Sequence, residues 1–166
     1  MAQVTLHGSP ANTNGDLPAV GSTAPDFKLV DAALNDVSLA DFAGKKKLIS
    51  IVPSLDTPTC ATSTKVFNQR LGSRSDVVVL VVSADLPFAQ GRFCQAEGTA
   101  DVKTLSMMRS RNFAKDYGIL LVDGPLAGIT ARGALVLDAD NKVVYAQLVG
   151  EIGDEPDYDA AIAALG

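Results

Sequence analysis

The chain has 166 residues, a formal net charge of −5 at pH 7 and 47% apolar residues, few of them aromatic. This length fits a single domain over residues 1–166, built around a core of mostly aliphatic side chains. The acidic balance argues against nucleic acid or an anionic membrane as a partner, because binding phosphate groups needs a surplus of lysine and arginine.

Several other classes of protein are disfavoured by what the sequence lacks. No apolar run approaches the ~20 residues that span a bilayer. Residues 1–7 have neither the basic end nor the apolar core of a signal peptide, so we expect a cytoplasmic location. Two cysteines and the single His7, expected at the surface, are too few for a structural zinc site and provide no Cys–His protease pair. We expect neither a metal nor a cofactor.

The first elements along the chain are short strands. Val4–Leu6 and a second run near Val20 flank a turn-rich segment, and its Asn14-Gly15 pair predicts the tight turn of an N-terminal β-hairpin. Apolar alternation over 25–30 predicts a strand, and a shorter strand is expected over 37–39.

A buried strand then leads into a helix start. The apolar run over 47–52 predicts the strand, and Pro53 ends it because proline cannot continue a central ladder. Thr57 is a favoured N-cap residue, and Pro58 suits the first helical position. Cys60 is therefore expected at about the third position of the helix, where backbone N–H groups have no carbonyl partner.

That position has chemical consequences for a thiol. A thiolate gains from the unpaired N–H groups and from the positive end of the helix dipole, and it is the reactive form of cysteine. Cys60 occupies the place that Glu or Gln takes in a capping box. The alternative is that Thr57 is an ordinary cap and Cys60 a small buried apolar residue, as most free cysteines are.

The helix over 59–71 presents one apolar stripe. Cys60, Thr64, Phe67 and Leu71 share a face by helical spacing, so Cys60 is expected to be sheltered. The lysines at 45–47 are expected to be solvated in the turn before the strand over 47–52.

A central strand and a second helix follow. The β-branched run over 77–82 predicts a strand buried on both faces. Asp85 is expected to cap a short helix that ends near Gly98 and carries Cys94. The neighbours of Cys94 on that helix predict partial exposure of its sulfur.

The last third of the chain predicts a weak strand at 102–105, a short helix over 111–117, a hairpin of strands over 133–138 and 142–149, and a closing helix over 160–165. Strand, helix, strand, helix, then an antiparallel hairpin and a helix is the order of an α/β, thioredoxin-like fold, with a central mixed sheet flanked by helices.

The two cysteines lie on different helices and do not form a CxxC motif. A disulfide between them would have to form against the helical geometry and would be readily reduced, which suits a catalytic role. The alternative is that Cys94 is an unpaired bystander.

Several segments resemble a known family. Pro53–Cys60 resembles the Pro-x-x-x-Thr/Ser-x-x-Cys signature of the peroxiredoxins. The resemblance extends to their thiol peroxidase branch and covers nearly the whole chain. It rests further on Ser63, Phe67-Asn68, Asp85–Gln90, Arg92–Cys94 and Glu97-Gly98.

This resemblance implies an atypical two-cysteine peroxiredoxin. Cys60 would be the peroxidatic cysteine and Cys94 the resolving cysteine, joined in an intramolecular disulfide that thioredoxin reduces. Pro53 and Thr57 match the family's active-site proline and threonine, and Arg132 falls on its active-site arginine. Without the resemblance, Pro53 is equally a strand terminator, and Arg132, just before a strand, is equally a surface residue.

The sequence is compatible with two functional hypotheses. In the first, the chain is a peroxidase that reduces hydrogen peroxide and organic hydroperoxides, with a guanidinium that polarises the peroxide and a proline that shields the site from water. In the second, it is a redox-sensing or disulfide-exchange protein of the same fold without peroxide turnover. The absence of CxxC counts against the exchange version. A homodimer is expected, since the family commonly pairs.

Overall fold

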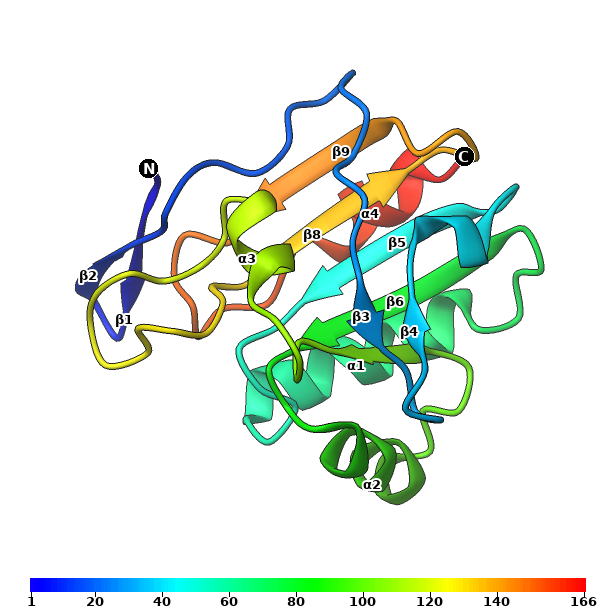
Figure 1. Ribbon diagram of the computed structural model, residues 1–166, viewed down its shortest axis with the longest axis horizontal. Helices are drawn as coiled ribbons and strands as arrows, with labels where there is room; N and C mark the ends of the chain where they lie inside the picture. Colours follow the sequence, from blue (N-terminus) through cyan, green and yellow to red (C-terminus); the bar gives the residue numbers. More distant parts are fainter.

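A seven-stranded mixed sheet lies at the centre of the structure, in the strand order β4-β3-β7-β6-β5-β8-β9 (Figure 1). The computed structural model describes all residues from 1 to 166. The strands are β3 (Leu29–Val30), β4 (Asp36–Val37), β5 (Lys46–Ile51), β6 (Val77–Ser83), β7 (Lys103–Ser106), β8 (Gly133–Leu137) and β9 (Val143–Leu148). Strands β5, β6 and β7 are parallel neighbours, whereas β8, β9, β3 and β4 pair antiparallel.

Helices cover both faces of this sheet. Figure 1 shows α1 (Pro58–Leu71) and α4 (Tyr158–Ala164) behind the strands and α3 (Asn112–Asp116) in front of them. Helix α2 (Pro87–Glu97) lies beyond α1, at the β7 side of the sheet. This arrangement confirms the predicted α/β, thioredoxin-like fold with a mixed sheet between helices.

Strand β6 shows why the sheet separates two cores. All seven of its residues are buried, and successive side chains point to opposite faces. Val79 and Val81 belong to the cluster under α1 and α4, which contains Cys60. Leu80 and Val82 belong to the larger cluster under α3 and the N-terminal segment. The unbroken apolar run therefore predicted a doubly covered strand correctly.

The N-terminal hairpin is present, but its turn is not where the sequence predicted it. Strands β1 (Gln3–Leu6) and β2 (Ser9–Asn12) pair antiparallel, and the turn is formed by His7-Gly8, both at positive φ. The prediction of a turn at Asn14-Gly15 is wrong, because the Asn14 side chain binds elsewhere. It donates to Lys115 O and accepts from Leu120 N, and so holds the chain against the α3 region.

Two other local predictions need correction. Lys47 is fully buried rather than solvated, and its Nζ donates to Asn141 Oδ1 at 2.6 Å. Of the segment 25–30, which was predicted to be a strand, only Leu29–Val30 is a strand. The strand predicted over 37–39 ends early, and a 3₁₀ helix, η1 (Leu39–Phe42), begins where it was expected to continue.

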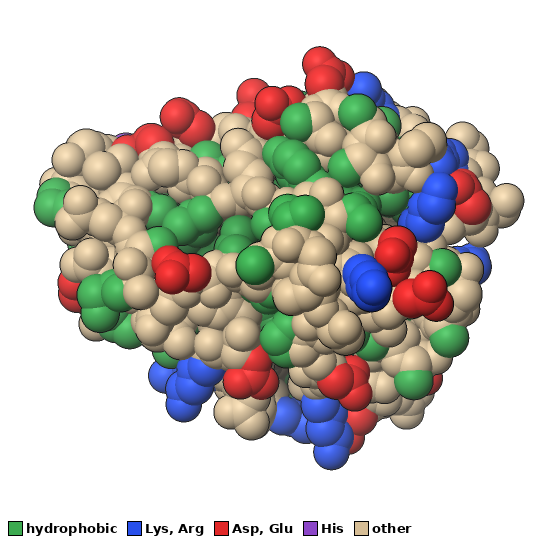
Figure 2. Space-filling view, turned by 90° about the horizontal axis from the view of Figure 1, so that it is seen from above, with side chains coloured by type: hydrophobic (Ala, Val, Ile, Leu, Met, Phe, Trp, Pro, Cys, Tyr) green, Lys and Arg blue, Asp and Glu red, His purple; other side chains and the backbone are tan.

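The surface carries charges of both signs. In Figure 2, acidic and basic side chains are interspersed around one face, and apolar side chains gather over its middle. None of the helices has the length and apolar character needed to cross a bilayer.

Candidate active site

Cys60 occupies the third position of α1, as its sequence context predicted. Thr57 is the N-cap residue with extended backbone angles, and Pro58 begins the helix. The first helical hydrogen bond runs from Ala61 N to Thr57 O at 3.0 Å. The N–H groups of Thr59 and Cys60 precede it and have no acceptor in the structure. Two amide donors and the positive end of the helix dipole therefore lie at the base of the Cys60 side chain.

The side chain of Thr57 does not act as the helix cap. It makes no capping hydrogen bond, and its Oγ1 instead donates to Ser54 O at 2.9 Å. The position of Thr57 was predicted correctly, and the side-chain contact was not. As a result the N-terminal amides are not consumed by a capping hydroxyl, and Thr57 Oγ1 keeps its capacity to accept.

The sulfur of Cys60 is sheltered by the core. Cys60 is 0% exposed and packs in the cluster that includes Phe67 and Leu71, which confirms the predicted stripe. The hydroxyls of Ser63 and Thr64 both donate to Cys60 O. Pro53, at the other end of the loop, is buried as well.

Arg132 is far from Cys60 in the sequence, but it lies at the end of the sheet where the loop to Cys60 begins. The antiparallel register pairs Ile51 with Gly133, so Arg132 follows as the partner position of Val52, where the loop to Cys60 begins. Only 3% of its surface is exposed. The surface alternative for this arginine is therefore wrong.

Only some of the hydrogen-bond donors of the Arg132 guanidinium have acceptors. Its Nε donates to Ile152 O at 3.0 Å, and its Nη1 is buried without a partner. Thr59 Oγ1 donates to Gly153 O, the next carbonyl along, at 2.8 Å. One loop therefore holds both Arg132 and the first turn of α1, the turn that carries Cys60.

That loop is braced by the N-terminal hairpin. The Glu151 carboxylate accepts from Thr5 Oγ1 at 2.5 Å, and also from the amides of His7, Gly8 and Gly153. These hydrogen bonds, the one from Thr5 above all, lower the pKa of Glu151 to about 2. Glu151 cannot be recognised from the sequence, because Thr5, His7 and Gly8 are separated from it by most of the chain and no local pattern marks them.

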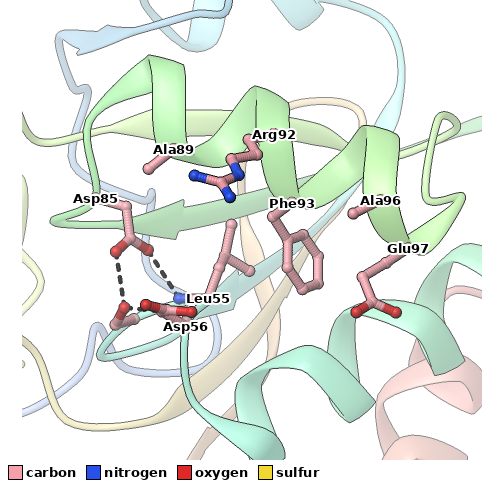
Figure 3. Close-up of a pocket in the computed structure, with 9 residues that line it drawn as sticks. Leu55, Asp56, Asp85, Ala89, Arg92, Phe93, Ala96 and Glu97 are labelled. Atoms are coloured by element: carbon pink, nitrogen blue, oxygen red, sulfur yellow. Dashed lines mark hydrogen bonds between the residues drawn. The ribbon is translucent and has the colours of Figure 1, made fainter.

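Cys94 lies on α2, half-buried as predicted, and both cysteines are free. Its side chain packs against the cluster that contains Cys60. A cavity of about 450 Å³ separates α2 from the loop before Cys60 (Figure 3); Phe93 lines it from the helix and Leu55 from the loop. The structure therefore places both sulfurs against one core cluster, but not bonded to each other.

The predicted cap of α2 is wrong. The N-cap residue is Leu86, and no side chain caps the helix. The carboxylate of Asp85 points to the other side of the cavity, where it accepts from Ser54 Oγ and Leu55 N at 2.7 and 2.8 Å (Figure 3).

This arrangement suits nucleophilic chemistry at a sulfur. It includes a cysteine at a helix N-terminus, unpaired amide donors, a buried guanidinium with a free donor and a second thiol packed against the same core cluster. No group of three or more His, Cys, Asp or Glu side chains that could hold a metal ion is present.

Comparisons with known proteins agree with this chemistry. The family model described as Redoxin matches residues 19–162. Thiol peroxidases of Mycobacterium bovis and Mycobacterium tuberculosis are 52% identical to the chain over 166 residues, covering 100% of it and 99% of each relative.

Solved structures give the same result. A peroxiredoxin-like protein from Aquifex aeolicus superimposes with a TM-score of 0.91 at 40% identity, over 99% of this chain and 96% of that one. A thiol peroxidase from Chromobacterium violaceum gives a TM-score of 0.91 at 29% identity, over 98% and 94% of the two chains.

Proposed function

The chain belongs to the redoxin family and is a thiol-dependent peroxidase that uses a hydroperoxide and a thiol reductant, and from this premise we propose that Cys60 attacks the peroxide and Cys94 resolves the product. The observation that carries the assignment is the place of Cys60 at the third position of α1, beside two amide donors without acceptors. Cys94 lies within α2, where its amide is part of a helix.

The reaction balances in three steps. The Cys60 thiolate attacks one oxygen of ROOH, an S–O bond forms, the O–O bond breaks, and RO⁻ leaves as ROH after taking a proton. Cys60 is then a sulfenic acid. The Cys94 thiol condenses with it, water leaves, and a Cys60–Cys94 disulfide forms. A dithiol reductant supplies two electrons and two protons by thiol–disulfide exchange and is itself oxidised to a disulfide.

The other predicted site residues have roles that their contacts support. The unpartnered Nη1 of Arg132 is a donor for the thiolate or for the oxygen that gains charge. The Thr57 hydroxyl, which donates to Ser54 O, has lone pairs that can accept the peroxide proton. Pro53, buried between the strand end and the loop, keeps water from the sulfenic acid.

Disulfide formation requires α2 to open. Of its residues only Pro87 and Gln90 are buried, so unwinding the turn around Cys94 exposes little apolar surface. The helix ends at Gly98 in a left-handed conformation, and glycine can take other backbone angles at little cost when the last turn opens.

We further propose thioredoxin as the reductant, the cytoplasm as the location and a homodimer as the assembled form. Two free cysteines suit a reducing compartment that contains dithiol proteins. Three exposed apolar side chains are of the kind that an interface between two copies covers: Phe88 on α2, Leu86 just before it, and Met108, which lines a pocket with Leu86. The single domain over 1–166 also remains a proposal.

The test is hydroperoxide consumption in the presence of thioredoxin and its reductase. Cys60→Ser is expected to abolish turnover. Cys94→Ser, the matched control, is expected to consume about one equivalent of peroxide and then stop, because Cys60 still reacts but cannot be resolved. Wild-type turnover by Cys60→Ser would refute the assignment, and sustained turnover by Cys94→Ser with thioredoxin would refute the role of the second cysteine.

A further inference from the structure

The loop between β5 and α1 is tied to the rest of the molecule at Val52, which donates to Val82 O and accepts from Thr130 Oγ1, and beyond it through residues 53–57. Within residues 53–57, the Asp56 amide and the Thr57 amide and hydroxyl bind back to Ser54. Thr57 O also accepts the first helical hydrogen bond of α1. The other hydrogen bonds of residues 53–57 all go to the carboxylate of Asp85. Ser54 Oγ donates to one of its oxygens and Leu55 N to the other (Figure 3).

Asp85 is itself held firmly. Ser83 Oγ donates to its carboxylate at 2.7 Å, and Ser106 Oγ donates to its main-chain oxygen at 2.5 Å. These two serines end the neighbouring strands β6 and β7. The carboxylate is therefore an acceptor fixed at the ends of two strands, and it holds the loop before Cys60 in place.

The same network reaches the helix that carries Cys94. Gln90 on α2 is fully buried, and its Nε2 donates to Ser83 Oγ and to Leu105 O, both at 3.0 Å. Ser83 thus links Gln90 to Asp85, and one chain of hydrogen bonds connects α2 to the loop before Cys60.

We propose that Asp85 is a positioning residue of the peroxidase reaction, whose carboxylate holds the Ser54–Thr57 loop and thereby sets the start of α1 at which Cys60 meets the peroxide. The inference rests on the proposed role of Cys60. Without Asp85, residues 53–57 have no hydrogen bond to the sheet, so the segment between Val52 and the Thr59–Gly153 hydrogen bond, which includes Thr57, can shift relative to Arg132. Small displacements of reacting groups cost large factors in rate.

The test measures the rate at which Cys60 reacts with hydrogen peroxide in single-turnover experiments. Since the chain has no Trp, the reaction is stopped by rapid quenching with an alkylating reagent, and the reduced and oxidised proteins are counted by mass spectrometry. We expect Asp85→Asn to lower the second-order rate constant roughly 10- to 100-fold and to leave reduction of the preformed disulfide by thioredoxin unchanged. Ser54→Ala, which removes one of the two links without burying a new group, is expected to give a smaller loss.

The matched control is Asp138→Asn. This half-buried carboxylate is likewise a hydrogen-bond acceptor within a turn, but its donors are the main-chain N–H groups of Asp140 and Lys142 in the β8–β9 turn. It is expected to react with peroxide at the wild-type rate. A loss of rate in Asp138→Asn as large as in Asp85→Asn would overturn the proposal, because it would indicate a general loss of stability.

A double variant separates positioning from an independent effect. Because Ser54 acts through Asp85, adding Ser54→Ala to Asp85→Asn is expected to slow the reaction less than Ser54→Ala does alone. Fully multiplicative losses, or Asp85→Asn within twofold of wild type, would overturn the role of Asp85. Peroxide turnover by Cys60→Ser would instead overturn the proposed function, so the two failures are distinguishable.

Discussion

The reactivity proposed for Cys60 depends on groups that reach it from separate parts of the chain. Its own helix supplies the unpaired amides of Thr59 and Cys60, and Arg132 supplies a buried donor from the start of β8. Electrostatic stabilisation of this kind is strong only where water is excluded, and Cys60 is fully buried. The donors and the burial therefore act together.

The role of Arg132 can be tested with two variants that separate the geometry of its donors from its charge. Arg132→Lys keeps a positive charge but loses the planar fork of donors, and Arg132→Met loses both. We expect the rate constant for reaction with peroxide to fall by a factor of roughly 10² in Arg132→Met, and by less in Arg132→Lys. Arg111→Met, which changes an exposed arginine on the approach to α3, is the control and should keep the wild-type rate. Equal rates for Arg132→Met and Arg111→Met would contradict the role of Arg132.

The place of Cys60 could be predicted from sequence because it follows from local rules. A threonine, a proline and the count along one helical turn are enough to fix it. The contacts of Asp85 and Glu151 could not be predicted in this way. A cap pattern at Asp85 was a sound local expectation, but its carboxylate binds loop residues far back in the chain, and tertiary contacts prevail over local propensity when they satisfy more donors.

At the scale of elements, the N-terminal hairpin serves as a brace for the site. Its turn residues donate to Glu151, whose neighbour Ile152 accepts from Arg132. Next to it, Gly153 accepts from Thr59. The hairpin therefore supports, through one short loop, both the guanidinium and the first turn of α1.

This brace predicts a pH dependence. The pKa of Glu151 is lowered from 4.5 to about 2 in the folded protein. Its stabilising hydrogen bonds are therefore fully present above the unfolded pKa and are lost as the pH falls from 4.5 through the folded pKa. We expect the His7 and Gly8 amides to lose protection from hydrogen exchange in acid over that window.

Glu151→Gln provides the comparison, since it cannot titrate. Its His7 and Gly8 amides should exchange with no acid transition below pH 4.5, and with lower protection than wild type at neutral pH. Wild-type amides whose protection is unchanged down to pH 2 and matches that of the variant would contradict the brace.

Elements were predicted more reliably than the turns between them. The buried runs of β5 and β6 and the periodic face of α1 are set by burial on a sheet, which the pattern of apolar residues reports directly. The Asn14-Gly15 pair failed as a turn signal because its amide was already engaged in contacts with Lys115 and Leu120. A dipeptide pattern cannot report such contacts.

At the scale of the whole molecule, two core clusters pack against one sheet, and Lys47 places a charged group among these buried side chains. Lys47 is fully buried, and its Nζ makes one hydrogen bond, to Asn141. Burial lowers its pKa, and the charges of Asp138 and Asp140 offset this only in part. A buried charge with partial compensation costs stability.

Replacing this charge is expected to stabilise the protein. Lys47→Met keeps the aliphatic volume, and we expect the free energy of unfolding at neutral pH to rise by about 1 kcal/mol. Because the folded-state pKa is the lower one, the wild type binds fewer protons when folded and gains stability as the pH rises towards 10.5. The advantage of Lys47→Met should therefore shrink in alkali.

Denaturant unfolding of both proteins at several pH values measures this difference. Lys45→Met, which changes an exposed lysine two residues earlier, is the control and should unfold like the wild type. A Lys47→Met variant that is less stable than wild type at neutral pH would show that the bond to Asn141 outweighs the desolvation of the charge.

The central claim is that peroxide converts the two free thiols into a disulfide within one chain. The most direct measurement is the intact mass of the reduced protein before and after one equivalent of hydrogen peroxide, followed by peptide mapping without reduction. We predict that the wild type loses two hydrogens and yields a peptide pair joined through Cys60 and Cys94, and that Cys94→Ser gains one oxygen at Cys60. An unchanged mass, or a wild-type protein that gains oxygen while both cysteines stay unlinked, would contradict the account.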